Sequence, residues 1–291
     1  MPTPDKPRHR SGYAAEETEQ VKAVCLTVAV TLGAYLDDLC IVGGLVPALL
    51  IDTTRPGDDD ELHPGTNDLD VGLALALLDD QRYAEVSSRL RAEGFEPYTN
   101  DSGNQTVQRW CLGDLKVTID FLIAPADDHD PALRIQNLEP DFGAVITPGL
   151  ELAFDEHTLI ELDGHALNGE HARRKVPVCG PAAFVVLKAL AFGDRSEPKD
   201  AYDLVYVIRH TPRHGVAIAE LLQLQAENHP EIVMQSLGLL ARDFNTPEAI
   251  GPRRAASFTA ADNTEVDDAA ADAHGYVDDL LRAATRLGLR S

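Results

Sequence analysis

The sequence predicts an α+β fold, in which a mixed β-sheet with helices mainly on one side is followed by an all-helical C-terminal region. Short apolar runs bounded by Gly, Pro, Asn and Asp alternate with helical periodicity up to residue 123, and β-like segments continue to residue 162. From residue 181 the apolar spacing is helical almost to the C-terminus. We therefore predict a disordered tail at residues 1–14, a sheet domain at 15–178 and a helical domain at 179–291.

The individual elements follow from periodicity and from the residues that interrupt it. Gly94 ends one predicted helix, Gly113 and Asp114 form a turn between two strands, and Pro181 occupies the first position of a strong apolar helix. The expected helices are 16–36, 45–51, 77–93, 181–192, 200–210 and most of the chain from 216 onward; the expected strands are 39–42, 68–75, 106–111, 115–123, 143–147, 151–154 and 158–162.

The charge balance is strongly acidic, with 25 Lys and Arg against 48 Asp and Glu and a net charge of −23. Proteins that coat nucleic acid neutralise its phosphates with Lys and Arg, so the composition excludes that class but leaves room for a local basic groove. An acidic surface also suits a cationic substrate.

The cysteines and the apolar runs indicate a reduced, non-membrane protein. Cys25, Cys40, Cys111 and Cys179 form no CxxC pair, so we expect free and mostly buried thiols rather than disulfides or zinc ligands. The first 20 residues lack the apolar core of a signal peptide, and no apolar run is long enough to cross a membrane. We therefore expect a cytoplasmic protein.

The Gly43-Gly44 pair lies between a predicted strand and a predicted helix. Glycine allows backbone amides to approach a ligand, and a helix N-terminus attracts anions, so nucleotide phosphate is a candidate ligand. A tight connection without a ligand is the commoner use of such a pair.

Three aspartates on predicted strands form a candidate metal site. Asp68 and Asp70 are two residues apart on one strand and therefore project from the same face. Asp120 interrupts an apolar strand, where an unpaired acid is rare. If the two strands are neighbours, the three carboxylates converge and are expected to bind one or two Mg²⁺ ions.

The order of these features resembles the nucleotidyltransferase superfamily of the DNA polymerase β type over residues 39–123. The segments FVVLKALAF and EPKDAYDLVYVIRH resemble the C-terminal motifs of the AbiEii-type, MenT-like toxin nucleotidyltransferases, and this resemblance spans most of residues 39–210. It implies that residues 15–178 are a nucleotidyltransferase core, that Lys188 and Lys199 bind the nucleotide and that Asp203 belongs to the catalytic site. Thr66 matches a Ser or Thr of the family, with phosphate binding and turn capping as its two candidate roles.

The chemistry of Lys188 agrees with this assignment, because an ammonium on an apolar helix needs an anionic partner. Asp200 and Asp203 lie one turn apart on the following helix, so Asp203 is a candidate partner, as is Asp70. Extension of the Lys188 side chain to solvent is the alternative.

The resemblance implies a Mg²⁺-dependent enzyme that moves an NMP from an NTP to an acceptor and releases pyrophosphate. A tRNA 3′ end is a candidate acceptor, a toxin of a toxin–antitoxin or phage-defence system is the expected role, and a cognate antitoxin is a candidate partner. An aminoglycoside-type antibiotic nucleotidyltransferase and a non-catalytic, antitoxin-like or regulatory binding module of the same fold are the alternatives.

Several weaker candidates complete the prediction. Arg109 is expected to face phosphate or base. The acidic segments 58–61, with His63, and 127–130 resemble metal sites in composition but lack ligand spacing. The basic residues available to an RNA groove are Arg173, Arg174, Lys175, Arg195, Lys199, Arg253 and Arg254.

Overall fold

The computed structural model of this 291-residue chain describes residues 7–51, 62–74, 80–113, 115, 117–126, 132–260 and 263–289. The described residues pack into two compact units. The helical unit takes its residues from Met1–Ala14, Leu50–Pro64 and Gly180–Ser291, and the sheet unit from Ala15–Leu49 and Gly65–Cys179. No described helix has both the length and the apolar character needed to cross a membrane.

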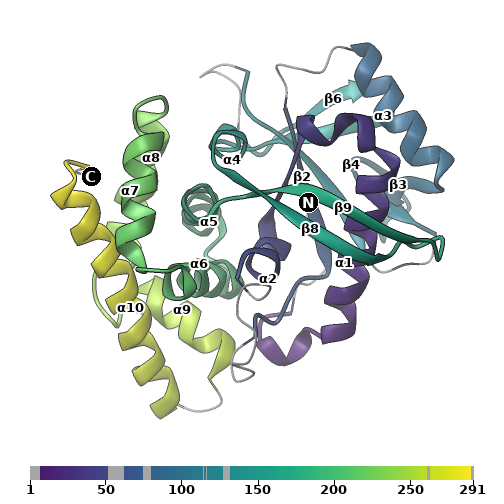
Figure 1. The fold of residues 1–291 in the computed structure, drawn as a ribbon. Helices are drawn as coiled ribbons and strands as arrows, with labels where there is room; N and C mark the ends of the chain where they lie inside the picture. Colours follow the sequence, from purple (N-terminus) through teal and green to yellow (C-terminus); the bar gives the residue numbers. More distant parts are fainter. Residues whose placement is uncertain are drawn as a thin grey trace. The chain divides into compact units, whose positions relative to one another are not determined.

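The described strands of the sheet unit form one nine-stranded sheet in the order β3-β4-β5-β2-β1-β9-β8, with β7 beside β5 and β6 beside β7. The paired strands β8 and β9 and the helix α1 are labelled in Figure 1. The pairs β2–β5, β1–β9 and β5–β7 are parallel and the others are antiparallel, so the sheet is mixed as predicted. The strands are β1 (Leu39–Val42), β2 (Asp68–Leu73), β3 (Phe95–Thr99), β4 (Gln105–Leu112), β5 (Thr118–Ile123), β6 (Ile135–Glu139), β7 (Phe142–Ile146), β8 (His157–His165) and β9 (His171–Cys179).

The two faces of the central strands differ because alternate residues point to opposite sides. Apolar residues of β2 and β5 form one fully buried face. The helix α1 (Ala15–Thr31) packs against β2, β8 and β9, and α3 (Asp80–Ala92) packs against β3 and β6. Phe121 lies 4.9 Å from Phe142, and Phe142 lies 6.5 Å from Tyr83 of α3, measured between ring centroids. The opposite face of β2 carries Asp68 and Asp70, so the core holds the strands while leaving these polar side chains on the other side.

Residues 151–154 were expected to form a strand, and this prediction is wrong. They belong to the short helix α4 (Glu151–Asp155). Leu150, Leu152 and Ala153 are all fully buried, a spacing that fits a helical turn better than a strand. The Sγ of Cys40 lies 3.3 Å from the carbonyl oxygen of Ala153, so α4 packs on β1.

The helical unit is built from α5 (Pro181–Arg195), α6 (Pro198–His210), α7 (Gly215–Gln225), α8 (Pro230–Asp243), α9 (Ile250–Thr259) and α10 (Asn263–Arg286). Proline in the first turn of α5, α6 and α8 has the backbone angle of a helix start and needs no amide hydrogen there. These helices confirm the predicted helical C-terminal region.

The predicted N-terminal tail is described from residue 7 onward. Arg10–Gly12 forms the 3-10 helix η1, and Arg10 donates a hydrogen bond from Nη2 to the carbonyl oxygen of Leu62 over 2.9 Å. The ring of Tyr13 lies 5.9 Å from that of Phe258 on α9. The described part of the tail therefore packs within the helical unit.

Candidate active site

The turn after β1 makes room for an aspartate side chain. Gly43 has φ of 70°, in the left-handed region that favours glycine, and Val42 pairs with Asp70 across β1 and β2. A Cβ atom at position 43 would lie only 1.8 Å from Oδ2 of Asp70. Gly43 is therefore required by the Asp70 carboxylate, and the buried Gly44 follows it in the 3-10 helix η3 (Gly43–Leu45), ahead of α2 (Val46–Leu50).

The parallel pairing of β2 and β5 brings the three predicted aspartates together. Asp70 is directly opposite Asp120, and Asp68 lies on the same face of β2. One carboxylate oxygen from each residue lies within 4.8 Å of the other two, the one such acidic group of three among the described residues. Asp68 is buried, whereas Asp70 and Asp120 are partly exposed. Like charges this close are unfavourable unless a cation holds them.

Thr66 contacts the first of these aspartates. Its hydroxyl donates a hydrogen bond of 2.7 Å to Oδ1 of Asp68, and both side chains are buried. Gly65, with φ of 85°, precedes Thr66 and leaves space for Thr18, whose Oγ1 would lie 1.6 Å from a Cβ at that position. Thr66 therefore orients the Asp68 carboxylate at the start of β2.

Arg109 on β4 is ion-paired with Asp120. Its Nε and Nη2 donate hydrogen bonds of 2.6 Å and 2.5 Å to the two oxygens of Asp120. This bonding raises the pKa of Arg109 above its ordinary value, and the negative charges of Asp68 and Asp70 raise it further. The prediction of a phosphate or base contact for Arg109 did not anticipate this ion pair.

Lys188 belongs to a cluster of paired charges within the helical unit. Its Nζ is 2.9 Å from Oδ1 of Asp200 and 2.8 Å from Oδ2 of Asp203. Burial alone lowers the pKa of Lys188, but the two carboxylates outweigh that effect and raise it. The structure therefore has Asp203 as a partner of Lys188, as expected, and the alternative of a lysine extended into solvent is wrong.

Asp203 is the centre of this cluster and is completely buried. Lys199 donates to both of its oxygens over 2.9 Å, and Nε2 of His63 lies 2.8 Å from Oδ1. Although burial opposes ionisation, the two lysines hold the pKa of Asp203 well below its usual range. Arg195 completes the cluster through hydrogen bonds of 2.6 Å and 2.9 Å to Asp200.

His63 is a residue whose role the sequence did not indicate. Burial lowers its pKa to about 4, so the imidazole is neutral at neutral pH and donates to Asp203 from Nε2. The centroid of the His63 ring lies 5.8 Å from that of the Tyr202 ring and 5.0 Å from that of the Tyr206 ring. A histidine in a Pro- and Gly-containing loop follows no periodicity, so no sequence pattern could have identified this contact. The acidic segments 58–61 and 127–130 lie outside the described residues.

The basic residues proposed for an RNA groove are largely engaged by acids. On the β8–β9 pair, Asp163 is in register with Arg173 and Glu161 with Lys175, so opposite charges face each other across the strands. Ion pairs join Arg173 to Asp163, Arg195 to Asp200, Lys199 to Asp203 and Arg253 to Asp267. The positive charge available to an RNA phosphate is correspondingly reduced.

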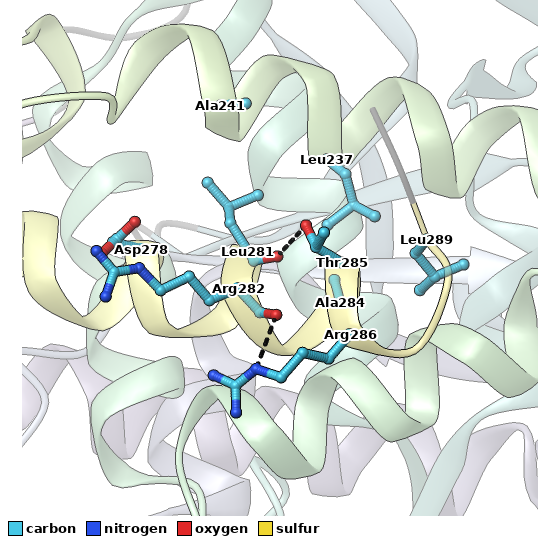
Figure 2. A pocket seen from close by; sticks show the side chains of 9 residues that line it. All are labelled: Leu237, Ala241, Asp278, Leu281, Arg282, Ala284, Thr285, Arg286 and Leu289. Carbon is cyan, nitrogen blue, oxygen red and sulfur yellow. Dashed lines mark hydrogen bonds and ion pairs between the residues drawn. The ribbon is translucent and has the colours of Figure 1, made fainter.

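A pocket of about 490 Å³ lies between α8 and α10 in the helical unit (Figure 2). Its wall includes Leu237 and Ala241 of α8 and Leu281 of α10. Arg282 is ion-paired with Asp278 over 2.7 Å on the rim. None of the predicted site residues lines this pocket, so it is separate from both charge clusters.

Comparison with known proteins identifies the family. A model described as nucleotidyl transferase AbiEii toxin, type IV TA system, matches residues 66–286, which is well over half of the chain and confirms the resemblance. A solved antigenic nucleotidyltransferase-like protein from Paracoccidioides brasiliensis is 17% identical, with a TM-score of 0.40, over 76% of this chain and 94% of that one. No curated protein matches the sequence. The chain belongs to the AbiEii nucleotidyltransferase toxin family of type IV toxin–antitoxin systems.

Proposed function

We propose that this nucleotidyltransferase moves an NMP from an NTP to an acceptor hydroxyl, using Mg²⁺ bound by Asp68, Asp70 and Asp120. The observation that carries the proposal is the convergence of three carboxylate oxygens within 4.8 Å on one face of the sheet. The acceptor hydroxyl releases its proton to solvent and its oxygen forms a bond to the α-phosphorus. The bond from that phosphorus to the oxygen bridging it to the β-phosphorus breaks, and pyrophosphate leaves with that oxygen.

The donor set fits Mg²⁺, which prefers oxygen ligands and binds carboxylates together with substrate phosphates. The three carboxylate oxygens lie close enough together to contact one ion, which would offset the repulsion among them. A bound ion would stabilise negative charge on the triphosphate and favour the deprotonated acceptor, and a second ion is compatible with this chemistry. In this proposal Thr66 keeps Asp68 oriented, and the backbone of Gly43 and Gly44 binds phosphate.

Lys188 and Lys199 remain proposed nucleotide-binding residues, with Asp203 as the carboxylate that holds them. Both ammonium groups are ion-paired, so binding to phosphate requires them to exchange partners. Lys199→Ala should raise the KM for the NTP if Lys199 binds nucleotide. A variant with unchanged KM and a lower Tm would assign Lys199 a purely structural role.

RNA, with the tRNA 3′ end as the first candidate, is the proposed acceptor because the family consists of toxins of toxin–antitoxin systems. The family also implies an antitoxin as a partner. A cationic aminoglycoside is the second candidate, favoured by the net charge of −23 and by the ion pairing of the basic residues.

The test incubates the full chain with Mg²⁺ and each of the four α-labelled NTPs, with total RNA, purified tRNA or an aminoglycoside as acceptor. Label on RNA supports the first candidate and label on the drug supports the second. Asp68→Asn should abolish labelling, since it removes a metal-binding charge but retains an acceptor for the Thr66 hydroxyl. Asp101→Asn, in an exposed turn, is the matched control and should be fully active. Absence of label in every arm would contradict NMP transfer to these acceptors and favour the non-catalytic alternative.

A further inference from the structure

Arg109, Asp120 and Asp70 form a row across three neighbouring strands. The register pairs Arg109 of β4 with Asp120 of β5, and Asp120 with Asp70 of β2. Residues in register on adjacent strands project from the same face of a sheet. Arg109 is therefore held beside the carboxylate trio by the backbone, whatever the state of its side chain.

Both oxygens of Asp120 are occupied by Arg109 in this structure. The two hydrogen bonds, of 2.6 Å and 2.5 Å, form the parallel bidentate geometry that gives Arg–carboxylate pairs their strength. Asp120 is also one of the three proposed metal ligands. Since a carboxylate oxygen cannot face a guanidinium and a divalent ion equally well, the two cations compete for Asp120.

The surroundings of the pair allow such an exchange. The side chains of Arg109 and Asp120 are 12% and 13% exposed, so both reach solvent. Arg109 stays charged at any working pH, and its planar fork also matches two oxygens of a phosphate. If Asp120 turns to a metal ion, Arg109 needs another anion, and the triphosphate arrives with that ion.

We propose that Arg109 is the counter-ion of Asp120 in the metal-free enzyme, and that it exchanges Asp120 for phosphate oxygens of the nucleotide when the divalent ion binds. This inference rests on the proposed function, because it assumes that the trio binds a metal. It gives Arg109 two opposite effects, since the residue weakens binding of the metal alone and strengthens binding of the metal–nucleotide complex.

The test uses the full chain with Arg109→Gln and two separate titrations. Binding of Mn²⁺ alone is followed by the loss of the free-ion signal in electron paramagnetic resonance. Removing one positive charge next to the trio should raise the affinity for Mn²⁺ roughly tenfold. Binding of the α,β-methylene analogues of the four NTPs is then measured at saturating Mg²⁺, where losing the bidentate phosphate contact should lower affinity roughly tenfold.

Two further variants make the result specific. Arg91→Gln removes an exposed arginine that pairs with Asp141 and stacks over Trp110, and it should change neither affinity. Arg109→Lys keeps the charge but loses the fork, so Mn²⁺ affinity should stay near that of the parent and analogue affinity should fall. If circular dichroism shows that Arg109→Gln does not fold, the analogue affinity of Arg109→Lys decides the test.

Three results would overturn the inference. Weaker Mn²⁺ binding by Arg109→Gln would mean that Arg109 organises Asp120 for the metal instead of competing with it, and unchanged Mn²⁺ binding would mean that the two cations do not share Asp120. Unchanged binding of the NTP analogues by Arg109→Gln would show that Arg109 does not contact the nucleotide phosphates. If the parent chain binds no Mn²⁺, the proposed metal site fails as well, whereas opposite shifts without NMP transfer would contradict only the proposed reaction.

Discussion

Two charge clusters, one in each unit, use the same residue types in opposite ways. In the sheet unit, carboxylate oxygens of Asp68, Asp70 and Asp120 lie within 4.8 Å of one another, and Asp70 and Asp120 are partly exposed. Arg109 is ion-paired with Asp120. In the helical unit, Asp200 and Asp203 are buried and bonded to two lysines, an arginine and a neutral histidine. Like charges therefore lie close together in the first cluster, whereas opposite charges are paired in the second.

This difference separates a cluster that could hold a divalent cation from one whose charges are already paired with one another. Three carboxylates this close repel one another, and a divalent cation bound among them would offset that repulsion. A buried and compensated cluster loses more than it gains when any member is removed, because the remaining charges are left without partners. Mutations in the first cluster should therefore affect activity with little loss of stability. Mutations in the second cluster should lower folding stability, and the KM for the NTP reports separately on any contact that Lys188 or Lys199 makes with nucleotide.

The largest expected effect is on the catalytic rate. Asp70→Ala should reduce NMP transfer by roughly a thousandfold or more, the scale seen when a preorganised electrostatic group is removed. Its Tm should be unchanged or higher, since the change relieves repulsion among the carboxylates. Transfer of labelled NMP and a thermal melt of the same sample measure both. An Asp70→Ala chain that is inactive because it is unfolded would assign Asp70 a structural role.

The second effect is a loss of folding stability in the helical unit. Asp203→Ala leaves Lys188 and Lys199 buried without their shared carboxylate, so the free energy of unfolding should fall by about 3–5 kcal/mol. Urea denaturation followed by circular dichroism measures the loss. Asp243→Ala on α8, whose partner Arg242 is mostly exposed, is the matched control and should cost less. Equal losses in the two variants would argue that Asp203 is not the centre of a buried cluster.

The third effect is a pH dependence caused by His63. Its pKa is about 4 in the folded chain and near 6.5 when unfolded, so between these pH values only the unfolded chain binds the proton. Stability should therefore be complete above pH 6.5, fall as the pH decreases to 4, and lose roughly 3 kcal/mol in total at about 1.4 kcal/mol per pKa unit. Unfolding free energies at several pH values measure it.

His63→Gln should remove this dependence, because the amide can still donate to Asp203 but does not titrate in that range. The contribution of Asp200 falls in a different window, since its folded pKa is about 2 against 3.8 when unfolded. Equal slopes for His63→Gln and the parent chain between pH 6.5 and 4 would show that His63 is not buried in the neutral form.

The smallest expected effect concerns the turn after β1. Gly43→Ala combines left-handed backbone strain with a clash against Asp70, whereas Gly103→Ala, with φ of 77° and open space, has the strain alone. The strain should cost each variant about 1 kcal/mol. Gly43→Ala should in addition weaken Mn²⁺ binding by displacing the Asp70 carboxylate. Denaturation and Mn²⁺ titration compare the two variants, and equal Mn²⁺ affinities would contradict the clash.

Much of the fold and site is encoded locally. The two-residue spacing of Asp68 and Asp70 places both on one face of a strand, Gly43 follows a short apolar strand, and proline marks the start of α5. Such features depend on backbone geometry within a few residues, so the sequence alone predicted the α+β class, the helical C-terminal region and the candidate aspartates. The family motifs added the expectation of a nucleotidyltransferase.

Local patterns misled or failed where burial depends on distant partners. Residues 151–154 are mostly apolar, as a short buried strand would be. They form α4 instead, because they pack on β1 as a helical turn. β9 was not predicted, since Arg173, Arg174 and Lys175 hide its alternation and its exposed half is paired with β8. The predicted division at residue 178 stays a prediction, and it did not indicate that His63, far before that point in the chain, contacts Asp203 of the helical unit.

The sequence by itself determined which residue types were available for chemistry, because side-chain charge and strand periodicity are local properties. Only the tertiary structure decided their partners. Parallel pairing of β2 with β5 brought Asp120 to Asp70, and the β4–β5 register brought Arg109 onto Asp120. Folding of the helical unit joined His63 to Asp203 across 140 residues. Long-range pairing depends on which surfaces are buried together, and no local pattern encodes that choice.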